Sequence, residues 1–276
     1  MKKRLLQRSA LGALLFELCA MLCLAGSPAS AQDWAKQILD KSPRHQEWVK
    51  IPVDGRALDA FVDYPEVKGK APVIVLIHEI FGLSDWARSM ADDLAAQGYI
   101  VIAPDMLSGT GPNGGGSSAY PDQDARVKAV SALSNDTVMA DLNAAANYGK
   151  KLPAANGKLF VVGFCWGGGK SFAFATVRHD LTAAFVFYGP QPDNIAAITA
   201  PVYAFYAGND ARITSTVPAT TEAMKAAGKK YEPVVYSGAG HGFMRAGEDP
   251  SNTNTDNVKA RKEGLQRLLE LLKKLS

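Results

Sequence analysis

A short apolar strand that runs into a glycine-rich turn around a cysteine constrains the fold of this chain most. Val161 and Val162 precede residues 163–168, Gly-Phe-Cys-Trp-Gly-Gly, and a helix-like segment follows at once. A nucleophile on a sharp strand-to-helix turn needs neighbours without a Cβ, because side chains there would clash with the strand or the helix. The helix N-terminus beyond the turn is expected to favour the thiolate form of Cys165. The pattern predicts acyl transfer with Cys165 as the nucleophile.

Strand-like and helix-like segments alternate from residue 73 onward. Residues 73–77 are continuously apolar, which is typical of a strand buried on both faces. We predict further strands at residues 48–53, 58–64, 99–103, 159–162, 183–188, 202–207 and 232–236. We predict helices at residues 86–97, 124–150, 167–178 and 255–275. This order predicts one α/β domain over residues 32–276, with a mostly parallel, doubly wound sheet flanked by helices.

An acid and a histidine follow Cys165 in the chain, each just beyond a predicted strand. Asp210 follows the strand at residues 202–207, and His241 lies in the loop after the strand at residues 232–236. Nucleophile, acid, histidine is the chain order of the α/β-hydrolase triad. Imidazole would take the thiol proton and later protonate the leaving group, while the carboxylate would hold the imidazole tautomer. We therefore predict a catalytic triad of Cys165, Asp210 and His241.

The first 31 residues have the three parts of a secretory signal peptide. Basic residues at positions 2, 3, 4 and 8 precede an apolar run over residues 10–25, and Ala29-Ser30-Ala31 suits cleavage. An uncleaved membrane anchor is the alternative, but the run is short for a span and contains Glu17. We predict a secreted, periplasmic protein that begins at Gln32 and has no stable membrane association.

Cleavage would change both the charge and the cysteine count. Residues 1–31 hold four basic residues and one acid, so the formal net charge would fall from +3 to zero. A balanced charge gives no reason to expect nucleic-acid binding. Cys19 and Cys23 would also be lost, which leaves Cys165 unpaired in an oxidising compartment. Its position in the turn favours a working thiol over an inert buried one.

Three motifs together resemble the dienelactone hydrolases, also called carboxymethylenebutenolidases. They are the turn around Cys165, the sequence His-Glu-Ile-Phe-Gly at residues 78–82, and His-Gly-Phe at residues 241–243. The resemblance extends from about residue 50 to residue 270. It implies the α/β-hydrolase fold and a hydrolase that cleaves a lactone or ester through a thioester on Cys165. It implies no cofactor. His45, His78 and His179 show no metal-ligand spacing, so the sequence predicts no metal site.

The resemblance also assigns roles around the nucleophile. The family's matching glutamate contacts the thiol and helps to generate the thiolate when substrate arrives, which implies a catalytic role for Glu79. A carboxylate at the end of a buried strand is costly unless it is paired, so a structural salt bridge is the alternative. The backbone N–H groups of Ile80 and Trp166 occupy the positions expected to form the oxyanion hole.

Two arginines match the family's substrate-binding arginines. Arg245 stands four residues after His241, and Arg126 lies at the start of the long predicted helix. Guanidinium groups at the mouth of a site suit a carboxylate on the substrate. Each could instead form a surface ion pair. Tyr188 ends a strand beside the site and is predicted to line the pocket.

Two other functions remain open at this point. A general carboxylesterase or thioesterase would keep the same fold and change the substrate. A ligand-binding or thiol-redox protein would keep Cys165 but would not need Asp210 and His241 at triad positions. We expect the partner to be an anionic small-molecule ester or lactone, and the protein to be a monomer.

Overall fold

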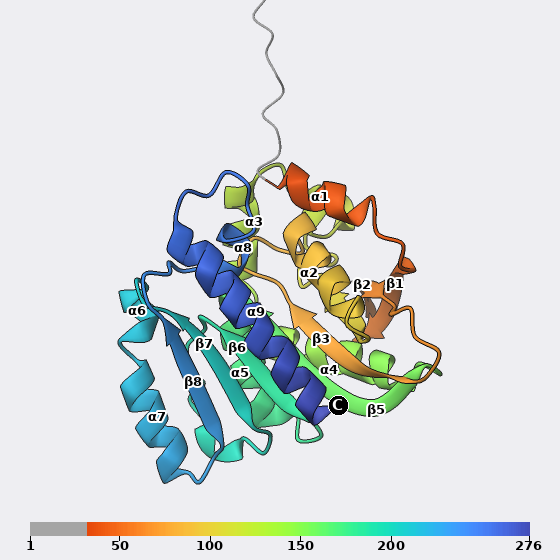
Figure 1. Cartoon of the computed structure of the whole chain (residues 1–276). Helices are drawn as coiled ribbons and strands as arrows, with labels where there is room; N and C mark the ends of the chain where they lie inside the picture. Colours follow the sequence, from red (N-terminus) through yellow and green to blue (C-terminus); the bar gives the residue numbers. More distant parts are fainter. Residues whose placement is uncertain (1–31) are drawn as a thin grey trace, which may run out of the picture. The chain divides into compact units, whose positions relative to one another are not determined.

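A computed structural model describes residues 32–276, and the predicted signal peptide lies outside the described residues. These residues form an eight-stranded sheet in the order β1-β2-β4-β3-β5-β6-β7-β8 (Figure 1). The strands are β1 (Gln46–Val53), β2 (Arg56–Asp63), β3 (Ala71–Ile77), β4 (Ile100–Pro104), β5 (Ala155–Phe164), β6 (Ala183–Phe187), β7 (Val202–Ala207) and β8 (Tyr231–Tyr236). Strands β3 to β8 pair in parallel, whereas β1 and β2 pair with their neighbours in the antiparallel sense. The predicted α/β-hydrolase architecture is confirmed.

Helices cover both faces of the sheet. The α-helices are α1 (Asp33–Leu39), α2 (Asp85–Ala95), α3 (Gln123–Ser131), α4 (Asn135–Lys151), α5 (Trp166–Val177), α6 (Ala211–Thr214), α7 (Val217–Ala226), α8 (Phe243–Ala246) and α9 (Thr255–Leu275). Figure 1 shows α2 and α9 in front of the sheet and α4 and α5 behind it. The side chains of β3 alternate between the two resulting cores: Val73, Val75 and Ile77 pack with α4 and α5, and Ile74 and Leu76 pack with α2 and α9.

The single helix predicted over residues 124–150 is wrong, because the structure divides it into α3 and α4. The Ser134 side chain accepts a hydrogen bond from the backbone N–H of Thr137 at 3.1 Å, which caps α4 and begins a new helix. The periodicity of the sequence continues across this break, so hydrophobic spacing alone does not reveal it.

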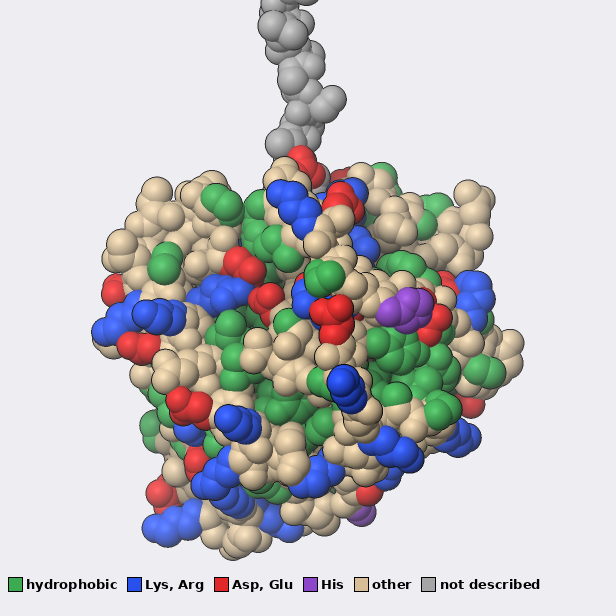
Figure 2. Space-filling model, turned by 45° about the vertical axis from the view of Figure 1, so that its right-hand side comes forward, with side chains coloured by type: hydrophobic (Ala, Val, Ile, Leu, Met, Phe, Trp, Pro, Cys, Tyr) green, Lys and Arg blue, Asp and Glu red, His purple; other side chains and the backbone are tan. Residues whose placement is uncertain are grey.

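Some apolar side chains remain outside the two cores. The large hydrophobic side chains exposed in the described part of the chain are Ile38, Trp48, Val67, Val177, Val235 and Val258. Figure 2 shows hydrophobic side chains across the middle of one face, between charged ones. None of the helices within residues 32–276 combines the length and hydropathy needed to cross a bilayer.

A buried pair of acids joins the segment before β1 to β2 and α2. Asp63 and Asp92 are both buried. Arg44 donates from Nε to Asp92 Oδ1 at 2.7 Å, and Gln46 Nε2 donates to Asp63 Oδ2 at 3.1 Å. Asp63 Oδ1 has no hydrogen-bond partner among the described residues. Burial and the neighbouring charge of Asp92 raise the pKa of Asp63 to about 8. A proton on Asp63 therefore keeps two carboxylates from repelling each other at neutral pH.

We expect Asp63→Asn to weaken the dependence of stability on pH. An unfolded aspartic acid ionises near pH ~4, whereas Asp63 keeps its proton in the folded protein until about pH 8. Stability from this group is therefore present below the lower value and is lost progressively as pH rises to the higher one. An amide cannot ionise, so the fall in Tm between about pH 5.5 and about pH 9 should shrink by several degrees, at about 2–4 °C per kcal/mol.

Calorimetric melts of wild type, Asp63→Asn and a control test this expectation. The control is Asp124→Asn, which changes an exposed carboxylate on α3. The control should follow the wild-type curve. An Asp63→Asn curve parallel to wild type across the whole pH range would show that Asp63 does not hold a proton.

Candidate functional site

Cys165 lies at a strained turn between β5 and α5. Its backbone has φ 56° and ψ −117°, a left-handed conformation that non-glycine residues rarely adopt. A Cβ at Gly163 would lie 2.0 Å from the carbonyl oxygen of Gly167, and one at Gly168 would lie 2.2 Å from that of Phe187. The glycines therefore let the chain turn tightly, and the turn presents the thiol at the carboxyl end of the sheet.

The structure brings Cys165, His241 and Asp210 together. His241 Nε2 lies 3.0 Å from Cys165 Sγ, and His241 Nδ1 lies 2.5 Å from Asp210 Oδ2. The three residues come directly after β5, β8 and β7 or in the loops that follow, so the carboxyl edge of the parallel sheet gathers them. The imidazole is held on one side by a carboxylate and faces the sulfur with the other. This arrangement can move a proton between the thiol and a reacting oxygen.

Two backbone N–H groups also face the sulfur. Those of Trp166, at the start of α5, and Ile80, after β3, lie near enough to the sulfur to lower the pKa of the thiol. An oxygen that develops negative charge on a carbon attached to Sγ would lie close to both donors. The two predicted oxyanion positions therefore lie beside the nucleophile.

The resting thiol is neutral, which differs from the expectation drawn from the turn. Burial and the nearby negative charge of Glu79 raise the pKa of Cys165 to about 11. Three nearby groups lower the pKa of the thiol: the N–H groups of Trp166 and Ile80 and the guanidinium of Arg212. Their effect is smaller than that of burial and Glu79. The helix N-terminus alone is therefore not enough to hold a thiolate at neutral pH.

Glu79 is paired with Arg245 and makes no hydrogen bond with the thiol. Arg245 Nε donates to Glu79 Oε2 at 2.7 Å, and the Glu79 side chain is 3% exposed. The guanidinium of Arg245 also lies over the ring of Phe81, 5.1 Å from its centroid. Burial raises the pKa of Glu79, and the charge of Arg245 opposes this rise. The contact between glutamate and thiol that the resemblance implied is thus replaced in this structure by an ion pair.

The other two predicted binding residues lie in different surroundings. Tyr188 follows β6 with φ 42°, and its fully buried ring lies 5.0 Å from that of His241. Within residues 32–276 its hydroxyl has no side-chain hydrogen-bond partner, and Tyr188 is one of the residues that line the cavity beside Cys165. Arg126 lies in α3 and does not line this cavity. Tyr188 therefore lines the same cavity as the thiol, whereas Arg126 does not.

The cavity that reaches the thiol has a volume of about 410 Å³. Its lining residues are Ile80, Asn135, Cys165, Trp166, Gly169, Lys170, Ala173, Tyr188, Pro190, Gln191, Pro192, Asp193 and Arg212. Lys170 and Arg212 were not among the site residues predicted from the sequence. Their spacing from predicted site residues could have suggested that they lie near the site. Lys170 follows Trp166 by about one helical turn, and Arg212 stands two residues after Asp210.

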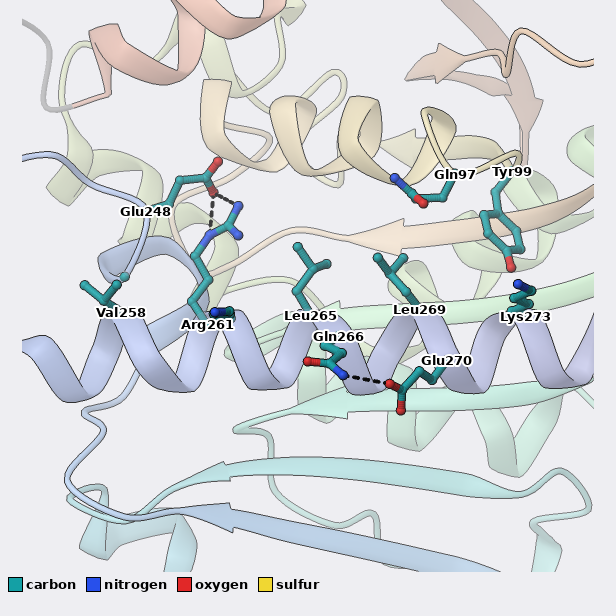
Figure 3. Close-up of a pocket in the computed structure, with 12 residues that line it drawn as sticks. Gln97, Tyr99, Glu248, Val258, Arg261, Leu265, Gln266, Leu269, Glu270 and Lys273 are labelled. Atoms are coloured by element: carbon teal, nitrogen blue, oxygen red, sulfur yellow. Dashed lines mark hydrogen bonds and ion pairs between the residues drawn. The ribbon is translucent and has the colours of Figure 1, made fainter.

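A larger cavity, of about 1010 Å³, lies along α9. Figure 3 shows Leu265 and Leu269 pointing from α9 toward α2, with the ion pair of Arg261 and Glu248 near one end. Its lining contains no cysteine, serine or histidine. Its lining therefore lacks the pair of thiol and imidazole that the structure brings together at Cys165.

Known proteins resemble this chain in sequence and in fold. The dienelactone hydrolase family model matches residues 58–276. A carboxymethylenebutenolidase of Pseudomonas putida is 31% identical over 205 residues, which cover 70% of this chain and 83% of that protein. A crystal structure from Klebsiella pneumoniae subsp. pneumoniae MGH 78578, described as a candidate dienelactone hydrolase, is 28% identical with a TM-score of 0.72, and covers 82% of this chain and 97% of that one.

A third similarity concerns the fold alone. The dienelactone hydrolase-like promiscuous phosphotriesterase P91 from metagenomic libraries is 20% identical with a TM-score of 0.70, over 84% of this chain and 98% of that one. The family match covers most of the chain, including all three motifs quoted from the sequence. This chain therefore belongs to the dienelactone hydrolase family and is a dienelactone hydrolase-like hydrolase with the α/β-hydrolase fold.

Proposed function

We propose that this protein hydrolyses a lactone or ester through a thioester on Cys165, with His241 and Asp210 completing the triad. The observation that carries the proposal is the environment of one sulfur atom. Cys165 Sγ lies 3.0 Å from His241 Nε2, and the nearby N–H groups of Ile80 and Trp166 lower the pKa of its thiol. A ligand-binding or redox thiol has no need for a base held by a carboxylate and two oxyanion donors around it.

The proposed reaction has two stages. In the first, His241 accepts the thiol proton, Sγ attacks the carbonyl carbon, and the N–H groups of Ile80 and Trp166 stabilise the oxyanion. The carbon–oxygen bond then breaks, and His241 gives the proton to the leaving oxygen. In the second, His241 takes a proton from water, the resulting hydroxide attacks the thioester, and the released thiolate recovers the proton. Asp210 stabilises the imidazolium in both stages.

An anionic substrate adds a second route to the thiolate. A substrate carboxylate that binds Arg245 competes with Glu79 for the same guanidinium. Without its counter-ion, the buried Glu79 carboxylate favours the protonated form and can accept the thiol proton. The high pKa of Cys165 makes this step useful, because the resting enzyme then avoids oxidation of a permanent thiolate.

We also propose that residues 1–31 direct export, so that the working protein is a periplasmic monomer that begins at Gln32. The basic, apolar and small-residue parts of this segment support the proposal. N-terminal sequencing of exported protein tests it, and a start at Met1 in a membrane fraction would contradict it.

Trapping of the thioester tests the proposed reaction. Rapid acid quench of wild type mixed with 4-nitrophenyl acetate should yield one acetyl group on the peptide that contains Cys165, in an amount that equals the burst of nitrophenolate. Glu79→Gln should slow the burst more with an acidic ester than with its methyl ester, because only the acidic ester competes for Arg245. An acyl group on another residue, or turnover without any acyl-enzyme, would reject the cysteine mechanism.

A further inference from the structure

We propose that Lys170 and Arg212 form a second anion subsite, which selects substrates whose acyl part ends in a carboxylate. The inference rests on the proposed function and specifies its substrate class. It concerns the 410 Å³ cavity that reaches Cys165, and not the position at Arg245, which does not line that cavity.

The cavity is placed to receive the acyl part of the substrate. Its lining includes Cys165 and the residues that carry both oxyanion donors, Ile80 and Trp166, but not His241. His241 must reach the leaving oxygen to protonate it, so the leaving group lies on the side of His241. The remaining part of the substrate, attached to the carbonyl carbon, is then directed into the cavity along the first turns of α5.

Two cations in this lining form no ion pair with a carboxylate of residues 32–276. Lys170 Nζ donates to Asn135 Oδ1 and lies 5.3 Å from the centroid of the Trp166 ring. Burial lowers the pKa of Lys170, which shows that water has been partly removed from its ammonium group without a compensating anion. Arg212 forms no ion pair or side-chain hydrogen bond within the described residues, yet it is near enough to Cys165 to lower the thiol pKa.

The charge and the surface of the cavity favour a monoanion on a carbon chain. Asp193 is the only carboxylate in the lining and is exposed, so Lys170 and Arg212 leave a net charge of about +1. One excess positive charge suits a carboxylate better than a doubly charged phosphate. Trp166, Ala173 and Pro190 supply apolar surface in the same cavity, which suits methylene groups between the ester and the acid.

A matched pair of chromogenic esters tests the subsite. The acidic member is 4-nitrophenyl hydrogen glutarate, and the neutral member is its methyl ester. The readout is the ratio of kcat/KM for the acidic ester to that for the neutral one. This ratio removes the effect of Arg212 on thiol ionisation, which acts on both substrates.

The variants are Lys170→Met, Arg212→Gln and the double variant, with Lys225→Met as the control. Lys225 is exposed on α7 and does not line the cavity. Wild type should prefer the acidic ester by about tenfold or more, and each single change should lower the ratio by about threefold to tenfold, as partly exposed charge pairs do. The double variant should lower the ratio further than either single change, and Lys225→Met should keep the wild-type ratio.

Binding to a Cys165→Ala background separates failure of the subsite from failure of the proposed function. Titration calorimetry with monomethyl glutarate should detect binding in this background and a loss of binding when Lys170→Met and Arg212→Gln are added. If wild type hydrolyses both esters with equal kcat/KM, or the double variant keeps its preference, the subsite is wrong while the hydrolase stands. If no ester is turned over but binding depends on Lys170 and Arg212, the subsite stands and the hydrolase function is wrong.

Discussion

Cys165→Ala is expected to remove ester hydrolysis, with a loss in kcat of about 10⁶-fold, the size seen when a comparable triad loses its nucleophile. The methyl group of alanine cannot form the thioester, and His241 is left facing a carbon atom. The fold should survive, because alanine keeps the Cβ of cysteine and meets the same φ of 56°. Kinetics with 4-nitrophenyl esters and thermal melts on the same preparation measure the two effects separately.

Cys165→Ser provides the matched comparison, because it keeps a nucleophilic atom of similar position. A hydroxyl is far harder to ionise than a thiol, and this site already disfavours an anion through burial and the charge of Glu79. We expect the serine variant to lose about 10³-fold or more in kcat, short of the alanine value. Wild-type turnover in Cys165→Ala would move the nucleophile elsewhere, and wild-type turnover in Cys165→Ser would show that the site does not depend on a thiol.

The order of the triad residues in the chain predicted that they lie together, because the carboxyl ends of parallel strands lie at the same end of a sheet. Residues that follow β5, β7 and β8 must emerge at one end of the parallel strands, so the sequence alone predicts that Cys165, Asp210 and His241 lie near one another. The turn was predictable for a different reason: glycine is required where backbone atoms approach to about the distances found at Gly163 and Gly168.

The partner of Glu79 could not be predicted from chain order. Both the thiol and Arg245 are near enough to attract its carboxylate, and the structure resolves this competition in favour of the guanidinium. The same competition explains the thiol pKa, because burial and an anionic neighbour together outweigh two N–H donors. The partner of Glu79 and the pKa of the thiol both depend on a small difference between large opposing interactions. The strength of each interaction depends on distances that the spacing of residues in the sequence does not fix.

The proposed role of Lys170 and Arg212 could not be predicted from the sequence either. Each resembles an ordinary surface cation in the sequence, one on α5 and one on α6. Their importance comes from the cavity, which forms only when the loop after β6 approaches α5. The break between α3 and α4 had a visible capping serine, Ser134, but the hydrophobic period concealed it.

Asp210→Asn is the second large expected effect, with a loss in kcat of about 10²- to 10⁴-fold. In a serine triad the corresponding loss is about 10⁴-fold, because the amide favours the wrong imidazole tautomer. His241 Nδ1 now donates to Asp210 Oδ2 at 2.5 Å, which leaves Nε2 free to accept the thiol proton. An asparagine NH₂ facing Nδ1 would instead place the proton on Nε2. A cysteine enzyme should lose less, because a thiol ionises more easily than a hydroxyl.

The choice of leaving group makes the Asp210→Asn test sharper. A nitrophenolate leaves without protonation, so the variant should lose only thiol activation and water activation with that ester. An alkyl ester also needs a proton from His241, so its loss should be greater by about tenfold or more. Backbone hydrogen bonds from Ile213 and Thr214 to the Asp210 carbonyl do not involve the side chain, so the loop should remain in place. Equal losses with both esters would mean that His241 does not protonate the leaving oxygen, and an unchanged rate with both would mean that Asp210 does not orient the imidazole.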